Sequence, residues 1–254
     1  MGSEPRHVVH RLHPALASVL GRTQGTAIGQ ALADRVIEAG AAKAFDTGVD
    51  RTAALAAFRW FLERSAGEGM PLTSAGYLKP ADVEAAAAVL PAMEEWPGSV
   101  RREINAHPVH DLREHMRESG LLRKYKGTLR SSRLGAACLK DVDALWKHLA
   151  DGLIVGGELV DTDTSVLLLV HLATTDGPID RATIASTLTD LGWMHRSGDP
   201  FSEWDVYPVW NFQWEVLGNV GDPANAGAIG RVASDAAKAL IRDALMQERR
   251  DNDH

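Results

Sequence analysis

Apolar residues recur at helical spacing through most of the first 150 residues, and this periodicity restricts the fold more than any other feature of the chain. Alanine is frequent in this part and aromatic residues are few. Residues 26–44 and 51–65 are predicted to form amphipathic helices, and the second places Leu55, Phe58 and Leu62 on one stripe. The segment FDTGVD between them has turn chemistry. We therefore expect a helical hairpin near the N-terminus.

The pattern changes after this hairpin. The segment GMPLTSAGYLK predicts a short extended piece, and the following helix is expected to begin at Pro80 and to stop at Pro91. Residues 108–119 form the next predicted helix. LLRKYK and TLRSS, separated by Gly127, have the length and turn signal of a small β-hairpin, and RLGAACLKDVDALWKHLA resumes as helix. The predicted order is strand, helix, helix, hairpin, helix.

A related order follows in the second half. The polar cluster GGELVDTDTS at 156–165 is predicted to be a linker, and SVLLLVHLATTDG is predicted to be a buried helix because it is apolar around most of its circumference. PIDRATIASTLTDLGW and residues 203–218 are predicted to be further helices. The Gly- and Asn-rich GNVGDPANAGAIG takes the place of a hairpin, and a last helix is expected through ALIRDAL.

These patterns predict a mainly α protein with small β-hairpins. We expect tandem winged-helix-like modules preceded by a helical segment. The expected divisions are a helical segment at 1–68, a first winged-helix-like module with a basic wing at 69–155, and a second, degenerate module at 156–254.

Charge is distributed unevenly along the chain. The formal total is -7, but residues 101–140 hold ten Lys and Arg against four acids, a local charge of +6 that leaves -13 for the remainder. The negative total argues against general attraction to nucleic acid or to anionic lipid. A local basic surface is expected around the hairpin.

A helix followed by a basic hairpin supplies what a DNA reader needs, namely phosphate neutralisation and side chains aimed at base edges. We expect Arg113 and Arg117 on the helix to face a groove of duplex DNA, while the hairpin contacts phosphates. The candidate nucleic-acid-binding residues are Arg113, Arg117, Arg123, Lys124, Lys126, Arg130 and Arg133. The alternative interpretation is that the helix packs internally and the charges only solvate a surface wing.

Aromatic residues gather in one acidic segment of the second half. Trp204, Trp210 and Trp214 are candidate interface residues, since exposed Trp anchors many protein interfaces. The alternative is core packing, because large aromatic residues at helical spacing normally face inward.

Signatures of enzymes and cofactor sites are missing. The sequence has no GxSxG, no phosphate-binding Gly loop with Lys and Ser or Thr, and no GxGxxG after a strand. The histidine-rich stretches HVVHRLH and HPVHDLREH lack the Cys pair or the HExxH pattern of a zinc site. We therefore predict a non-enzymatic protein with no catalytic residues, no cofactor and no metal.

Targeting signals are also missing from the sequence. The apolar run VLLLV is far shorter than the roughly 20 residues of a membrane span, and the polar start MGSEPRHVVHRLH lacks the apolar core of a secretory signal. Cys138 is the single cysteine, which excludes an internal disulfide and fits a reducing interior. We expect a cytoplasmic protein with no membrane partner.

Three motifs, LTSAGYLKP, GLLRKYKGTLRSSRLGAAC and ALWKHL, carry a resemblance to a known group. From about 70 to 250 the chain resembles the C-terminal region of bacterial proteins described as insertion-element passenger or plasmid open-reading-frame-three-like proteins. An LTxAGYL strand, a GLLRKxKG hairpin and an ALWxHL helix recur in that order in the group. The chain is also similar to winged-helix domains generally. The resemblance implies a fold and no particular activity, and helices stand here in place of the group's usual N-terminal domain.

Two functions follow as expectations. The first is a nucleic-acid-associated or regulatory protein that acts through the basic surface of residues 101–133, with duplex DNA as the partner. The alternative is a protein-interaction module in which the wings and the aromatic segment build a subunit interface, as in a homodimer.

Overall fold

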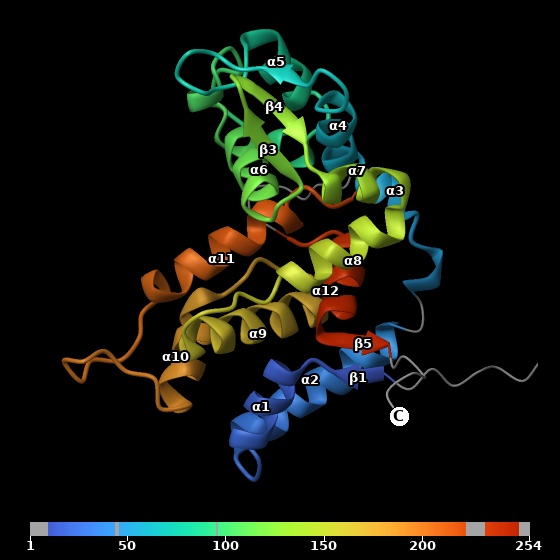
Figure 1. The fold of residues 1–254 in the computed structure, drawn as a ribbon. Coiled ribbons are helices and arrows are strands. Elements are labelled where there is room, and N and C mark those ends of the chain that lie inside the picture. Colours follow the sequence, from blue (N-terminus) through green and yellow to red (C-terminus); the bar gives the residue numbers. More distant parts are fainter. Residues whose placement is uncertain (1–9, 44–45, 95, 222–231, 249–254) are drawn as a thin grey trace, which may run out of the picture.

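The computed structural model describes residues 10–43, 46–94, 96–221 and 232–248. In this part the chain is mainly helical and carries small antiparallel sheets (Figure 1). The predicted fold class is confirmed at that level. No helix within the described ranges combines the length and the apolar character that crossing a membrane requires.

The elements have the following bounds. The helices are α1 (Pro14–Arg22), α2 (Ala27–Lys43), α3 (Arg51–Ala54), α4 (Ala56–Arg64), α5 (Pro80–Ala87), α6 (His107–Glu118), α7 (Arg133–Lys140), α8 (Val142–Gly152), α9 (Leu159–Thr174), α10 (Arg181–Asp190), α11 (Glu203–Leu217) and α12 (Asp235–Leu245). Short 3-10 turns are η1 (Asp46–Gly48), η2 (Pro91–Met93) and η3 (Glu103–Asn105). The strands are β1 (His10–Leu12), β2 (Met70–Pro71), β3 (Leu122–Tyr125), β4 (Thr128–Ser131) and β5 (Met246–Glu248).

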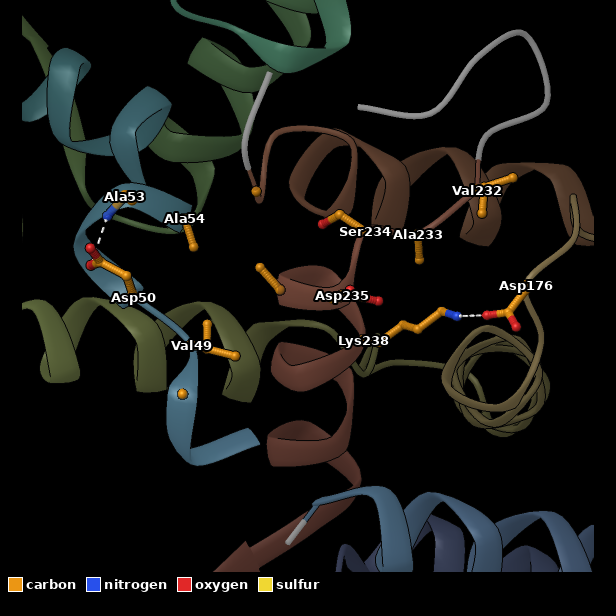
Figure 2. Close-up of a pocket in the computed structure, with 13 residues that line it drawn as sticks. Val49, Asp50, Ala53, Ala54, Asp176, Val232, Ala233, Ser234, Asp235 and Lys238 are labelled. Carbon is orange, nitrogen blue, oxygen red and sulfur yellow. Dashed lines mark hydrogen bonds and ion pairs between the residues drawn. The ribbon is translucent and has the colours of Figure 1, made fainter. Parts of the chain in front are cut away.

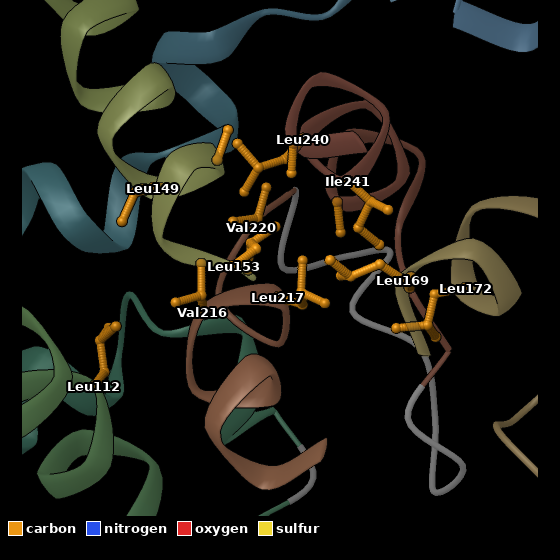
Figure 3. Packing of buried hydrophobic residues seen from close by; sticks show 14 of the residues in the cluster. Leu112, Leu149, Leu153, Leu169, Leu172, Val216, Leu217, Val220, Leu240 and Ile241 are labelled. Atoms are coloured by element: carbon orange, nitrogen blue, oxygen red, sulfur yellow. The ribbon is translucent and has the colours of Figure 1, made fainter. Parts of the chain in front are cut away.

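Helix α9 is the centre of the lower part of the molecule as drawn in Figure 1. It contacts α1, α2, α10, α11 and α12. The run VLLLV explains this position, because a helix that is apolar on all sides is stable only when other elements cover it. Figure 3 shows Leu169 of α9, Leu217 of α11 and Ile241 of α12 in the same apolar cluster. The N-terminal helices α1 and α2 thus belong to the packing of the C-terminal half.

The two ends of the described chain are joined. Strand β1 pairs antiparallel with β5, with Arg11 opposite Gln247. The backbone N–H of His13 extends this contact by donating to the carbonyl of Leu245 over 2.8 Å. The strand that follows the last helix is therefore paired with the N-terminal segment.

A three-stranded sheet lies in the upper part of Figure 1, among α4, α5, α6 and α7. Its strand order is β2-β4-β3, with all neighbours antiparallel. Leu122 and Leu129 on the sheet and Leu62 on α4 are fully or almost fully buried. The inner face of the sheet therefore closes the core of this part of the protein.

Several sequence predictions differ from the structure. The predicted single helix through RLGAACLKDVDALWKHLA is divided into α7 and α8, because Asp141 caps α8 by accepting hydrogen bonds from the N–H groups of Asp143 and Ala144. The predicted linker 156–165 is mostly helical, since α9 begins at Leu159. Buried Asp163 in this segment accepts hydrogen bonds from Arg22 and Trp193. The segment GNVGDPANAGAIG, expected in place of a second hairpin, falls largely on 222–231 and so lies outside the described residues.

Candidate nucleic-acid interface

The β3–β4 hairpin is built on a two-residue turn, Lys126–Gly127. Both residues have positive φ, 47° and 72°, which is typical of the type I′ turn whose twist matches antiparallel strands. Glycine accepts this conformation without cost, whereas Lys126 is held in it by the pairing of Tyr125 with Thr128 just beyond the turn. The sequence KG therefore fixes the register of the hairpin, and the predicted hairpin is confirmed.

The register assigns the side chains of the hairpin to two faces. Opposite residues of an antiparallel pair share a face, and faces alternate along each strand. Arg123 lies opposite Arg130, and Tyr125 lies opposite Thr128. These four residues occupy the outer face, while Leu122 and Leu129 occupy the inner face.

Tyr125 is the aromatic centre of the outer face. Its residue surface is 42% exposed. The guanidinium carbons of Arg123 and Arg130 lie 5.2 Å and 5.5 Å from the centre of its ring, and the Nζ of Lys126 lies 5.3 Å away. Each distance is within the range of a cation–π interaction. The charges around this tyrosine were expected from the sequence, whereas the role of the ring was not, although LLRKYKG contains it.

Four cations of the hairpin region have no acidic partner among the described residues. No ion pair within the described ranges involves Arg123, Lys126, Arg130 or Arg133. Arg123, Lys126 and Arg133 are exposed, and Arg130 is half-buried. The side chain of Arg130 lies close to Gly69, since a Cβ there would stand 2.8 Å from Arg130 Cγ. The outer face thus presents positive charge that no acidic side chain of the described residues neutralises.

Lys124 and Arg117 differ from these four cations, because both form ion pairs with Glu114. Arg117 Nε donates to Glu114 over 2.6 Å, and Lys124 Nζ lies 3.4 Å from the same carboxylate. Partial burial raises the pKa of Glu114, but the hydrogen bond from Arg117 and the charges of Arg113 and Lys124 outweigh it, so the pKa is lowered overall. Glu114 is therefore ionised near neutral pH and reduces what Lys124 and Arg117 offer to an external anion.

Arg113 is a correction to the sequence-based expectation. It is 1% exposed and cannot face a groove. Its Nε donates to Oε1 of buried Glu103 over 2.6 Å, and its Nη2 lies 2.8 Å from Glu114. Glu103 also accepts from the backbone N–H of Leu78, so the network ties α6 to the segment before α5. The charge of Arg113 serves the core of this part of the protein.

Helix α6 is also covered by a second element, α11. His115 of α6 packs its ring against Phe212 with a centroid distance of 5.0 Å, and its Nδ1 lies 3.4 Å from Glu215. His115 is 5% exposed. α11 therefore occupies one side of α6. The opposite side keeps Glu114 and Arg117 half-buried and Glu118 exposed, so its acidic side chains oppose the approach of phosphates. The hairpin is the most accessible basic part of the predicted interface.

The three candidate interface tryptophans of α11 are separated by the structure. Trp204 is 69% exposed, Trp214 is half-buried, and Trp210 is 1% exposed. Trp210 and Trp214 pack together with a centroid distance of 4.9 Å. Trp204 stands near Tyr207, which is also exposed. An external surface at this place can therefore include Trp204 but not Trp210.

A cleft of about 570 Å³ lies between η1, α3 and the start of α12. Figure 2 shows that its polar side chains bind to the protein itself: Asp50 accepts from the N–H of Ala53, and Lys238 pairs with Asp176. Ser234 caps α12 by accepting from Ala237 N and donates to the carbonyl of Val220. The remaining lining is mostly Gly, Ala and Val. This cleft does not assemble reactive groups around a common point.

The histidines of the stretch HPVHDLREH contact neighbouring side chains. His110 lies 3.1 Å from Glu103, and the ring of His107 packs against Trp96. Across the described ranges, no group of three or more His, Cys, Asp or Glu side chains is placed to hold a metal ion. Residues 1–9, which contain His7, the first histidine of HVVHRLH, lie outside those ranges.

Comparison of the chain with models of protein families, with curated proteins and with solved structures gave no match.

Proposed function

We propose that the β3–β4 hairpin binds nucleic acid through phosphate contacts, and that the protein is a binding rather than a catalytic protein. The observation that carries the proposal is the group of four cations without acidic partners, Arg123, Lys126, Arg130 and Arg133, three of which surround an exposed tyrosine. Like charges directly opposite each other on neighbouring strands destabilise a sheet. The Arg123–Arg130 pair is of this kind, and an anion between them would remove the cost.

We further propose that residues 69–155 form the winged-helix-like module with a basic wing. The element order β2, α5, α6, β3, β4, α7 and the sheet order β2-β4-β3 support this, because they match the order strand, helix, helix, hairpin, helix that the sequence predicts for this module. The hairpin is then the wing. Binding depends mainly on the wing, since Arg113 is buried and Arg117 of α6 is paired with Glu114.

The test is a salt series with a matched control. Binding of fluorescent oligonucleotides is measured by anisotropy for the parent, for Arg123→Ala/Lys126→Ala, and for Arg196→Gln/Lys147→Gln. The second double variant removes the same charge from the exposed loop before α11 and from α8. Each lost phosphate contact reduces the slope of log K against log salt concentration by about 0.7 to 0.9.

We expect the hairpin variant to lose about 1.4 to 1.8 units of slope, one contribution for each of the two removed contacts, and the control to keep the parent slope. Absence of binding at low salt would overturn the proposal. An equal loss in both variants would also overturn it, because the effect would then reflect total charge and not the hairpin.

A second candidate function rests on the exposed aromatic residues at the start of α11. Trp204 is 69% exposed, Tyr207 is 38% exposed, and Met194 in the preceding loop is 51% exposed. Exposed Trp and Tyr residues are frequent anchors of protein interfaces, so this surface is proposed as the contact between two copies of the chain. Sedimentation velocity of the parent and of Trp204→Ser tests it. A dimer that dissociates in the variant supports the contact, and a monomeric parent at high concentration refutes it.

A further inference from the structure

The outer face of the small sheet combines an aromatic ring with flanking cations. Tyr125 lies between Arg123 on its own strand and Arg130 on the neighbouring strand, and all three side chains are on one face by register. Pro71 of β2 is opposite Thr128 and exposed, so it continues the same face. A cationic surface built around an exposed aromatic ring is the arrangement on which proteins stack the bases of single strands.

We propose that this face binds single-stranded nucleic acid, with one base stacked at Tyr125 and the adjoining phosphates held by Arg123, Lys126 and Arg130. This inference rests on the proposed function and specifies its ligand class. The complementary charge of the polyphosphate identifies the occupant, because the three cations have no acidic partner in the described part of the chain.

The surroundings of the hairpin favour a single strand over a duplex. In a duplex the base faces are stacked inside and only the edges are accessible, so a duplex gains nothing from an exposed ring on a sheet face. Edge reading needs an element that enters a groove, and the side of α6 that α11 leaves uncovered carries Glu114 and Glu118, whose negative charge opposes the phosphates of a groove. Stacking on an exposed ring needs no such element and is sequence-tolerant, because every base has a π-face.

The cation–π contacts at Tyr125 give a second reason to expect that a base stacks there. Arg123 and Arg130 lie over Tyr125 within 5.5 Å of the ring centre. Guanidinium groups also stack on bases, so a base that packs on Tyr125 meets these planar cations at the same place. The Nε of Arg130 has no hydrogen-bond partner in the described structure, so ring and stem contacts hold this guanidinium without an acceptor.

The experiment compares four polymers of equal length. These are oligothymidylate, oligouridylate, an abasic deoxyribose-phosphate strand, and a mixed-sequence duplex, each measured by anisotropy at fixed low salt. The abasic strand keeps the phosphates and lacks the bases. Oligothymidylate and oligouridylate separate DNA from RNA as the source of the strand.

The protein variants are Tyr125→Leu, which keeps apolar bulk without an aromatic face, and Tyr125→Phe, which keeps the face. Thermal melting of each variant confirms that it is folded. We expect the parent to bind at least one base-containing single strand about fivefold or more tightly than the abasic strand, as one stacked base contributes. Tyr125→Leu should lose this difference and Tyr125→Phe should retain it, while the affinity for duplex changes less than about twofold in both.

The outcomes separate the two proposals. If the abasic strand, the duplex and the base-containing strands bind the parent equally, or if Tyr125→Leu binds as the parent does, single-strand stacking is overturned. The phosphate-binding function then still stands, provided that Arg123→Ala/Lys126→Ala weakens all four polymers. If no polymer binds, both proposals fall.

Discussion

Arg113 Nε lies 2.6 Å from Glu103 Oε1, and both side chains are buried. This contact joins α6 to η3, and the hydrogen bond from Leu78 N to the same carboxylate extends it to the segment before α5. The helix thus uses its most buried cation to hold the module together. The basic character of residues 101–133 therefore serves two purposes, structural at Arg113 and external on the hairpin.

The first prediction concerns this buried pair. Arg113→Met is expected to reduce the free energy of unfolding by about 3 to 5 kcal/mol, because it leaves the Glu103 carboxylate buried without its main partner. Urea denaturation of both proteins measures the change. The double variant Glu103→Gln/Arg113→Met is the control, since it removes the stranded charge. It should be more stable than Arg113→Met alone, and a loss below about 1 kcal/mol in the single variant would contradict the structure.

The second prediction compares two glycines of one loop. Gly69 has a φ of 79°, and a Cβ there would stand 2.4 Å from the carbonyl oxygen of Leu129. Gly67 has a φ of 62° with open space around it. Gly67→Ala should cost about 1 to 2 kcal/mol for the left-handed backbone alone. Gly69→Ala should cost clearly more, because the backbone of β4 has to move. Equal midpoints in thermal or urea unfolding would show that the loop does not lie against β4 as described.

The helical periodicity of α6 already indicated that position 113 is buried, although the charge of Arg113 favoured an exposed position. Val109, Leu112 and Met116 form the buried stripe of α6, and position 113 lies on the same stripe at the spacing i, i+3, i+4, i+7. The same spacing places Trp210 with Val206 and Val209 on the buried face of α11. A charged residue on an apolar stripe is buried only when a counterion meets it, and Glu103 lies ten residues away at the start of the short 3-10 turn η3. Local pattern therefore indicated the face but not the partner.

The hairpin was the most predictable part of the candidate site. Gly127 and the lengths of the two strands determine it, and these are local properties. Covering of α6 by α11 was not predictable, because it depends on contacts between segments about 100 residues apart, such as His115 with Phe212. That helix α9 begins within the polar segment 156–165 was not predictable either, because it also depends on contacts with distant residues. Asp163 is buried there because Arg22 and Trp193 satisfy its carboxylate.

The third prediction tests the two faces of the hairpin with neighbouring residues. Arg123 lies on the outer face and meets no acidic partner in the described part of the chain, whereas Lys124 lies 3.4 Å from Glu114. Arg123→Gln is expected to reduce the salt slope of nucleic-acid binding by about 0.7 to 0.9, as one lost phosphate contact does. Lys124→Gln should change it by less than half of that. Anisotropy titrations across a salt series measure both changes of slope. A larger change for Lys124→Gln than for Arg123→Gln would contradict the prediction, because it would place the contact surface on the face of Lys124.

The fourth prediction separates the tryptophans of α11. Trp210→Ala removes a side chain that is 1% exposed and should reduce the free energy of unfolding by about 3 to 5 kcal/mol. Trp204→Ala removes one that is 69% exposed and should change it by no more than about 0.5 kcal/mol in the monomer. Urea unfolding at low protein concentration keeps any association out of the comparison. A large loss from Trp204→Ala under these conditions would mean that its ring packs within the chain.

The last prediction concerns acid sensitivity through His171, whose ring is buried on α9. Burial lowers the pKa of His171 below its ordinary value of 6.5, and the nearby charge of Arg35 lowers it further, against a smaller opposite effect of Asp180. Its Nδ1 lies 3.2 Å from Arg35 Nη1, so the neutral ring accepts a hydrogen bond from the guanidinium. The unfolded chain therefore binds a proton at this residue more readily than the folded chain does.

The sign of the effect follows from this difference in proton binding. The contribution of His171 is complete above about pH 6.5 and is lost as the pH falls from there towards the lower pKa of the folded state. His171→Gln is expected to flatten the fall of unfolding free energy between about pH 7 and pH 5, although packing changes alter its absolute value. Urea unfolding at several pH values compares the two slopes, in which the contributions of the carboxylates are common to both proteins. A variant with the same slope as the parent would show that the ring is as easily protonated when folded as when unfolded, against the buried contact with Arg35.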